Sequence, residues 1–444
     1  MIRTRKGTGR LVAVAALVGL IVAGCSSGSS SKSSSSTSST SSGGSASTQK
    51  FPAVNQPGVT PTEIKVGGVA TVSNDPTGGS LGSAFDGVKA YFDYINSTGG
   101  VYGRKLVLSS QRDDGLANNR SEVQGLLTSD NVFAALPISV QLFTGAQLLS
   151  KAGIPTYGWD INPEWGSETQ KPGPANFFTN VGDYICFTCA LPSAQTWLPK
   201  KLNRHNIGVL AFNVSQSTGC AEGLQNSFKK YPTGKIVFMD KSLTFGTPDY
   251  SAQVARMKDK KVDLVISCLD GNGATTLGRE MKKQGLDAIQ VLPNSYNQGL
   301  ISKNADVLNG NYLFTTFTPF EVKPEPPGMK NYKEWIGKSG GKTNENSLMG
   351  WINADEFVTG LKAAGPNFTR QKVVDATNAI TDYTADGLVP PINWKTAHSK
   401  QIECYATVKV VDGKFKPVYG QSGKPFLCFP SDLTEMPANP QASA

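Results

Sequence analysis

The chain has 444 residues, more than one hydrophobic core usually serves, so its length predicts at least two domains. Its 43 lysines and arginines outnumber 34 aspartates and glutamates, a modest excess for this size. Since no basic run in the sequence contains interleaved aromatic residues, the composition argues against a nucleic-acid partner. Only two histidines are present, which argues against most metalloenzymes and histidine-based catalytic triads. We therefore expect no catalytic residues, no metal and no cofactor.

The first 25 residues have the layout of an export signal. A positively charged start precedes an apolar run over residues 11–23, which is shorter than the roughly 20 apolar residues of a membrane span. Small residues follow, and the ending VAGC at residues 22–25 resembles the bacterial lipobox. That resemblance implies a signal peptide at residues 1–24 and acylation (palmitate) of Cys25. The alternative is an ordinary signal peptide with an incidental cysteine.

The next segment predicts a tether. Residues 26–48 are almost wholly Ser, Thr and Gly, so they have little to bury and are expected to stay disordered. We assign residues 25–50 to the lipidated cysteine and a tether with a reach of about 25 Å. The sequence has no second apolar span. We therefore expect an extracytoplasmic protein held to the bacterial cell membrane through its lipid alone.

From residue 63, short β-rich runs alternate with amphipathic segments. Ile64–Ala70 predicts a strand, and the segment 83–96 predicts a helix because its apolar residues recur at spacings of three and four. The first series continues with strands at 106–110, 132–137 and 155–157 and helices near 118–128 and 143–151.

A second series begins near Tyr184 with a helix expected to reach Leu202. Strands that alternate with helices of this length predict βαβ units and mostly parallel sheets. Two such series predict an α/β fold of two doubly wound lobes, whose strand ends face a shared ligand cleft. The second series continues with strands at 207–212, 235–240, 262–267, 289–293 and 312–317 and helices at 221–230, 250–260 and 275–285.

Four segments, taken in order, carry a likeness to a known family. They are residues 64–108, AGIPTYGWDINPEW at 152–165, PDYSAQVARMKDKKVDLVIS at 248–267 and GWINADEFVTGLKAAG at 350–365. Together they resemble the type I periplasmic-binding-protein fold, and within it the leucine/isoleucine/valine-binding family of ABC-importer solute receptors. The likeness covers about residues 63–418.

The resemblance implies two lobes joined by a three-strand hinge, with crossings near Thr179, Thr318 and Trp394. It also implies a monomeric receptor, not an enzyme, that closes on a small molecule and delivers it to an ABC permease and its ATPase. A ligand-sensing lipoprotein without transport is an alternative that the sequence leaves open. The implied boundaries are 51–178 and 319–393 for lobe 1, 179–318 and 394–430 for lobe 2, and 431–444 for a C-terminal tail.

The family's amino-acid receptors hold the ligand carboxylate with a serine and a threonine of lobe 1. The serine position falls on Ser139, whose alternative role is to cap the helix that follows. The threonine position falls on Ile161, which has no hydroxyl. Nearby Trp159 and Tyr157 offer flat apolar faces to a ligand, although such rings could instead fill the interior of the lobe.

In lobe 2 the family's ammonium-binding acid falls on Asn294 or Ser295, and neither is charged. Burying an ammonium group without a carboxylate costs several kcal/mol. Asp270 could supply the acid, but an Asp before Gly-Asn-Gly is more often a turn or a helix cap. Tyr296 would lie against the apolar body of the ligand.

These departures predict a ligand with a sizeable apolar or aromatic body and at most one anionic or carbonyl group, near Ser139. The glycine-rich loop Ser73–Gly82 would add backbone N–H groups, with Ser73 and Asn74 among the ligand contacts and Asn74 or Asp75 available for hydroxyl groups of the ligand. Such a ligand is not a typical amino-acid zwitterion. Branched-chain amino acid binding remains the alternative.

Six cysteines remain besides Cys25. An even number in an oxidising compartment predicts up to three disulfides. Cys404 and Cys428 bracket a hairpin with Asp-Gly at its turn, which favours their pairing.

The other pairs follow from the resemblance. The family's lobe-2 tyrosine falls on Cys220, and the implied topology brings Cys268 near it, so these two are expected to pair. Cys186 is then left with Cys189. The alternative for this last pair is a redox-active CxxC motif, which would imply thiol-disulfide oxidoreductase activity. A zinc site is a weaker hypothesis than either, because no histidine is near the cysteines.

Overall fold

The computed structural model describes residues 51–75, 80–293 and 295–443. The expected signal peptide, Cys25, the tether and Asn294 lie outside these residues. Within the described part, no helix is both long and apolar enough to cross a membrane. The described residues belong to one unit of the chain, residues 49–444.

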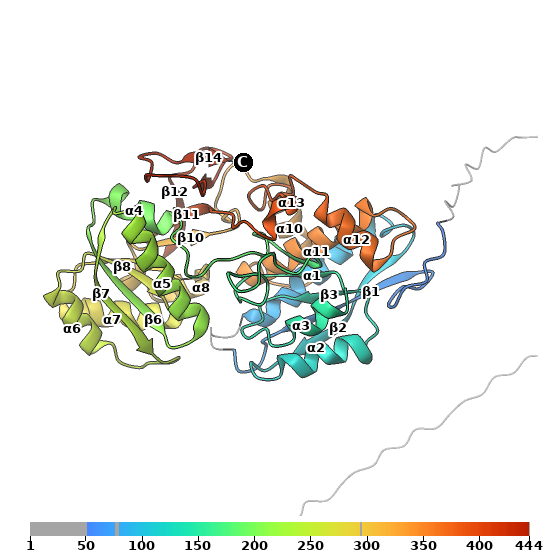
Figure 1. The fold of residues 1–444 in the computed structure, drawn as a ribbon, viewed down its shortest axis with the longest axis horizontal. Helices are drawn as coiled ribbons and strands as arrows, with labels where there is room; N and C mark the ends of the chain where they lie inside the picture. The colour runs from blue at the N-terminus through green and yellow to red at the C-terminus, as the bar shows by residue number, and fades with distance from the viewer. Residues whose placement is uncertain (1–50, 76–79, 294, 444) are drawn as a thin grey trace, which may run out of the picture. The chain divides into compact units, whose positions relative to one another are not determined.

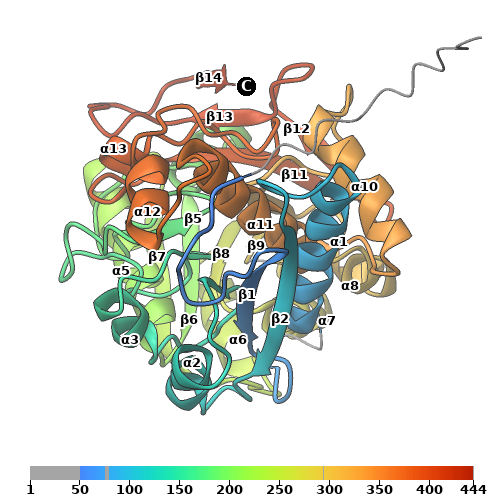
Figure 2. The same cartoon turned by 90° about the vertical axis from the view of Figure 1, so that its right-hand side faces the viewer.

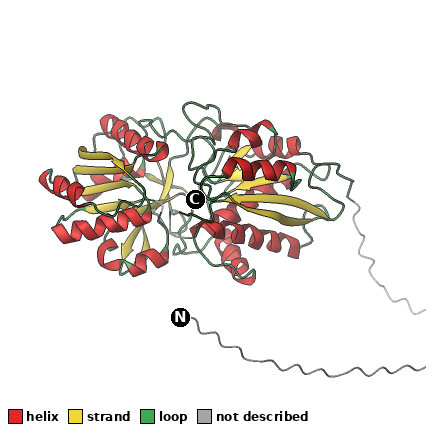
Figure 3. Cartoon of the chain, turned by 90° about the horizontal axis from the view of Figure 1, so that it is seen from below, coloured by secondary structure: helices red, strands yellow, loops and turns green. Residues whose placement is uncertain are grey.

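Lobe 1 contains a parallel sheet with the strand order β2-β1-β3-β4-β5. Its inner strands are almost continuously buried, as expected for a sheet with helices on both faces (Figure 3). Three late helices, α10 to α12, complete the lobe; α10 and α11 pack against α1, and α12 packs against α11 (Figure 1). The bounds are β1 Glu63–Ala70, α1 Ala84–Ser97, β2 Lys105–Asp113, α2 Asn119–Thr128, β3 Ala134–Pro137, α3 Ala146–Lys151, β4 Thr156–Gly158, β5 Phe177–Thr179, α10 Pro327–Lys338, α11 Glu345–Ala363 and α12 Arg370–Asn378.

Lobe 2 contains a mixed sheet with the order β14-β13-β11-β10-β9-β8-β6-β7, and β12 pairs with β11. Strands β6 to β10 are parallel, as predicted, whereas β11 to β14 add antiparallel pairs at one side. The bounds are α4 Ala194–Leu202, β6 Asn206–Phe212, α5 Ser215–Lys230, β7 Lys235–Leu243, α6 Ser251–Asp259, β8 Leu264–Cys268, α7 Gly271–Gln284, β9 Ile289–Leu292, α8 Gln298–Lys303, α9 Ala305–Leu308, β10 Tyr312–Thr315, β11 Cys404–Val411, β12 Lys414–Val418, β13 Phe426–Cys428 and β14 Gln441–Ser443. The short helix α13 (Trp394–Ala397), expected in lobe 2, instead packs against α12 and Phe178 of lobe 1.

Two helix starts in lobe 2 differ from the prediction. The helix expected from Tyr184 begins only at Ala194, because Ser193 and Thr196 form a capping box that fixes its first turn. The next helix starts earlier than expected, at Ser215. Its first turn is polar, so the regular spacing of apolar residues that predicts a helix is missing there. The hairpin of β11 and β12 is confirmed.

Lobe 1 is held together by a close contact between α1 and α11, which Figure 2 shows side by side. A Cβ atom on Gly87 would lie 1.8 Å from the carbonyl oxygen of Ser347, and one on Gly350 would lie 1.9 Å from that of Ala84. Only glycine lets the two backbones approach this closely. The contact joins the first helix of the lobe to a helix from the late part of the chain.

We predict that Gly87→Ala lowers the free energy of unfolding by about 1–3 kcal/mol, because the helices must move apart to admit the methyl group. Gly337→Ala in α10 is the matched control. A Cβ there meets nothing within 4 Å, so the change should raise stability by up to about 1 kcal/mol. Urea unfolding measures both, and an unchanged midpoint for Gly87→Ala would contradict the contact.

Candidate functional site

The loops that follow the parallel strands gather at one edge of each sheet, where α/β proteins bind ligands. In lobe 1 these loops begin at Thr71, Ile138 and Trp159, after β1, β3 and β4. In lobe 2 they begin at Asn213 and Leu269, after β6 and β8, with a further loop after β9. Most of the residues predicted to bind a ligand lie in or beside these loops.

Ser139 lies in the loop after β3, with a left-handed backbone (φ 59°) and 1% exposure. Its hydroxyl donates to Oδ1 of Asn346 at 2.8 Å, and Nδ2 of Asn346 donates to Oγ of Ser80 at 3.1 Å. Ser139 caps no helix, since Gly145 holds the cap position of α3. This buried hydrogen bond holds the loop after β3 against the start of α11.

Trp159 and Tyr157 have different environments although they are two residues apart. Trp159 lies just beyond β4 and is only partly buried. Tyr157 lies within β4 and is 0% exposed; its hydroxyl lies 3.1 Å from Oγ1 of Thr377, and its ring stacks on Phe178. The expectation that Tyr157 faces the ligand is therefore corrected, because its ring fills the interior of lobe 1.

Ser73 and Asn74 are exposed. The backbone N–H of Ser73 donates to the carboxylate of Asp113 at 3.0 Å, and Nδ2 of Asn74 donates to the carbonyl oxygen of Gly115 at 3.3 Å. These bonds tie the start of the glycine-rich loop to the loop after β2. The described contacts do not bring Ser73 and Asn74 to Ser139.

Tyr296 belongs to the hydrophobic cluster that residues of both lobes share. Its hydroxyl donates to Glu321 and accepts from the backbone N–H of Phe320 at 2.8 Å. Its ring stacks on Phe415 with 4.4 Å between centroids, and the residue is 2% exposed. The expectation that this ring covers a ligand is corrected, since other aromatic rings already cover it.

Asp270 is the cap of α7, and its carboxylate accepts from the backbone N–H of Gly273 at 2.6 Å. This is the helix-cap role that the sequence left open. Burial raises the pKa of the Asp270 carboxyl, against the lowering by the N–H groups of the cap. Its capping bond leaves less of this carboxylate available for an ammonium group.

Sequence reasoning missed the start of α11. Glu345 is the first residue of this helix and is partly exposed. Asn346 follows and bonds Ser139, as described above. Ser295 is 5% exposed, and its Oγ has no partner within the described residues. The polar residues at the start of α11, before its apolar stretch, are visible in the sequence. Only the fold brings them to the loops after β3 and β9.

Among the described residues there are three disulfides, and they are the expected pairs. Cys404 and Cys428 join β11 to β13. Cys220 in α5 is bonded to Cys268 at the end of β8.

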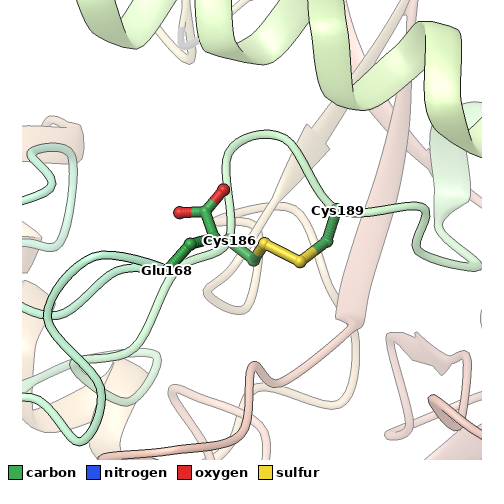
Figure 4. Close-up of side chains that lie close together, drawn as sticks. All are labelled: Glu168, Cys186 and Cys189. Atoms are coloured by element: carbon green, nitrogen blue, oxygen red, sulfur yellow. A yellow bond between two sulfur atoms is a disulfide. The ribbon is translucent and has the colours of Figure 1, made fainter.

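The third disulfide joins Cys186 to Cys189, in the segment between β5 and α4. Figure 4 shows the carboxylate of Glu168 beside it. This carboxylate accepts from the backbone N–H of Thr188 at 2.8 Å, which fastens the loop between the cysteines. The three side chains are close enough for one metal ion, but both sulfur atoms are engaged in the disulfide.

Two cavities lie away from these loops. One of about 480 Å³ lies between α5 and β7 and is lined by Phe228 and Phe238 among others. The second, of about 230 Å³, lies beside α1, α10 and α11, and its wall includes Asp355 and Lys362. Neither is lined by a residue predicted to bind the ligand.

The chain passes from the first sheet to the second after β5, returns to lobe 1 after β10, and enters the second sheet again at β11. Two α/β lobes connected in this way, with the binding loops at their sheet edges, define a two-lobed solute-binding protein. Residues 63–414 match the family model described as periplasmic binding protein, and the chain belongs to that family. The expected type I periplasmic-binding-protein fold is confirmed.

Solved structures share this fold at low sequence identity. A fatty acid ABC transporter substrate-binding protein from Thermomonospora curvata is 20% identical, with a TM-score of 0.70 over 87% of this chain and 98% of that one. The branched-chain amino acid transporter substrate-binding protein from Streptococcus pneumoniae, in complex with isoleucine, is 18% identical, with a TM-score of 0.65 over 80% and 98%. A solute-binding protein from R. palustris in complex with 4-hydroxybenzoate is 16% identical, with a TM-score of 0.65 over 85% and 98%. No curated protein matches the chain.

Several buried carboxyl groups favour the protonated form in the folded protein. Burial raises the pKa of Glu403 to about 7 and that of Asp355 to about 6. A carboxyl whose pKa is raised by folding stabilises the fold fully below its unfolded pKa, and this contribution is lost as the pH rises through the folded pKa.

We therefore predict a higher melting temperature at pH 5 than at pH 8. Glu403→Gln should remove part of the difference, because this carboxyl alone accounts for up to about 3 kcal/mol. Glu435→Gln is the control, since Glu435 is exposed. Thermal unfolding followed by circular dichroism tests this, and a higher melting temperature at pH 8 would contradict it.

Proposed function

We propose that this chain is an extracytoplasmic solute-binding lipoprotein of an ABC importer, which captures a small, largely apolar or aromatic molecule by closing its lobes. The observation that carries the proposal is the partly exposed ring of Trp159 at the carboxyl end of β4, where a parallel sheet receives ligands. Ile161, two residues later, is also partly exposed and adds apolar surface.

The related structures support an apolar body for the ligand. One belongs to a protein named for fatty acids, and another holds 4-hydroxybenzoate. A third holds isoleucine, which favours branched-chain amino acids as the second candidate. Against that candidate, the lobe-2 positions expected to meet an ammonium group are Asn294 and Ser295, neither of them acidic.

Closure requires a ligand that contacts both lobes. A ligand shifts an open–closed equilibrium only by the difference between its affinities for the two forms. The passages after β5, after β10 and before β11 would serve as the hinge. No bond is made or broken in this cycle, so the free energy of binding alone drives closure, and the protein is not an enzyme.

The lipid on Cys25 and the Ser-rich tether would keep the body, as a monomer, beside the permease and ATPase that we propose as partners. A sensor would use the same anchor and the same closure to signal to a membrane partner. Transport of the ligand by cells that carry the neighbouring permease genes, and its loss on their deletion, separates import from sensing.

We predict that probes with a phenyl or octyl body raise the melting temperature of the mature chain carrying Cys25→Ser. Trp159→Ala should weaken their binding about tenfold or more, because the loss of the aromatic surface under the ligand removes about 1.4 kcal/mol or more of contact energy. Trp335→Ala, which also removes a partly buried ring but in α10, is the control. Calorimetry gives the affinities. Micromolar binding of leucine, isoleucine or valine without any response to these probes would favour the second candidate instead.

We also predict that Cys25→Ser moves the protein from the membrane fraction to the soluble extracytoplasmic fraction, because the acyl anchor is lost. Ser26→Ala is the control and should stay with the membrane. Fractionation followed by immunoblotting checks both variants. Membrane retention of Cys25→Ser would show that the anchor is not the lipid.

A further inference from the structure

The smaller of the two cavities lies in lobe 1, apart from the loops at the edge of the sheet. Its volume is about 230 Å³, below the roughly 300 Å³ at which pockets for drug-sized ligands begin. Residues of α1, α10 and α11 line it, together with Ala385 and Asp386 from the loop after α12. The cavity therefore suits a small molecule, and it is separate from the cleft in which the proposed function places its ligand.

Polar residues of α11 follow one face of the helix along this cavity. Trp351, Asp355, Thr359 and Lys362 all line it, and their spacing of three or four residues is that of one helix face. The rise of an α-helix separates Asp355 from Lys362 by about 10 Å along the axis. The wall thus presents a carboxylate, a hydroxyl and an amine in this order.

The carboxylate of Asp355 is held in place by two tyrosines. Its Oδ2 accepts from the hydroxyl of Tyr91 at 2.6 Å, and its Oδ1 accepts from the hydroxyl of Tyr383 at 2.9 Å. A carboxylate has about four lone-pair positions, so two hydroxyl donors leave others open. Because Asp355 is partly exposed and lines the cavity, a bound donor group can reach those positions.

The mouth of the cavity carries one charge of each sign. Lys362 and Asp386 both line the cavity, and both are exposed. Among the described residues, no hydrogen bond or salt bridge engages the amine of Lys362 or the carboxylate of Asp386. The rings of Tyr94 and Trp351, stacked with 5.9 Å between centroids, form an apolar part of the wall. The cavity therefore offers acidic, basic and apolar surface to one small ligand.

These charges select the kind of ligand. An ion of one sign only would meet repulsion, from Lys362 if it is a cation and from the two carboxylates if it is an anion. A metal ion is a weaker occupant, because the three-ligand group of the described residues that could hold one lies at Glu168. A molecule that carries both charges meets attraction at both ends.

We propose that this cavity is a second binding site, for a small zwitterion with an ammonium group and a carboxylate. The ammonium group binds Asp355 and Asp386, and the carboxylate binds Lys362. The carbon chain lies against the rings of Tyr94 and Trp351. The inference goes beyond the proposed function, because it concerns another site and does not depend on what the cleft binds.

The test uses three probes with the same three-carbon body and different ends, namely β-alanine, propylamine and propionate. With the mature chain carrying Cys25→Ser at pH 8, β-alanine should bind about fivefold more tightly than propylamine, because it gains the contact with Lys362. Propionate should bind most weakly, since the wall has two carboxylates and one amine. Calorimetry gives the three affinities.

Variants at the two ends of the site should have different effects on the probes. Lys362→Gln should weaken β-alanine binding about fivefold and leave propylamine unchanged, because only the zwitterion uses this amine. Asp355→Asn should weaken both about tenfold or more, because both use the ammonium group. Lys372→Gln, exposed on α12 and outside the cavity, is the matched control and should change neither. Trp159→Ala, in the cleft, should also leave β-alanine binding unchanged.

Three results would overturn the inference. They are an equal β-alanine affinity in Lys362→Gln and Lys372→Gln, a loss of β-alanine binding in Trp159→Ala, and no binding of β-alanine to the parent chain. Because Lys362 is exposed, its variant decides the question even where Asp355→Asn unfolds the protein. The phenyl and octyl probes test the proposed function separately, so the failure of one proposal is distinguishable from the failure of the other.

Discussion

The direct backbone contact between α1 and α11 is the constraint on which the rest of lobe 1 depends. At Gly87 and Gly350 the two helices approach so closely that no side chain fits between them. The contact fixes a helix from the late part of the chain against the first helix of the lobe. It also carries the first turn of α11 to the loops after β3 and β9, so that Glu345 and Asn346 reach the candidate site. The chemistry of the site thus depends on a contact that lies outside it.

A buried hydrogen bond changes the role expected for the serine in the loop after β3. A serine in the loop after β3 would suit an anion if its hydroxyl were free to donate. Here the hydroxyl of Ser139 donates to Asn346, and the same serine becomes an acceptor.

The apolar part of the proposed ligand corresponds to Trp159, which extends beyond the end of β4 and is only partly buried. Because β4 belongs to lobe 1, closure requires further contacts from the loops of lobe 2. Contacts of that kind are what a two-lobed receptor needs, because they are stronger in the closed form than in the open form.

The sequence by itself determined the alternation of strands and helices, the hairpin turn at Asp412-Gly413 with its Cys404–Cys428 pair, and the family. These follow from local spacing, turn chemistry and a shared order of segments. Only the tertiary structure decided which partners the other four cysteines take, that Tyr157 and Tyr296 are interior rings, and that Asn346 bonds Ser139. The physical reason is that the burial of a ring and the direction of a hydroxyl are set by neighbours far away in the chain, such as Thr377 for Tyr157. The periodicity of apolar residues shows how residues are spaced along one helix or strand. It does not show which distant residues those positions contact.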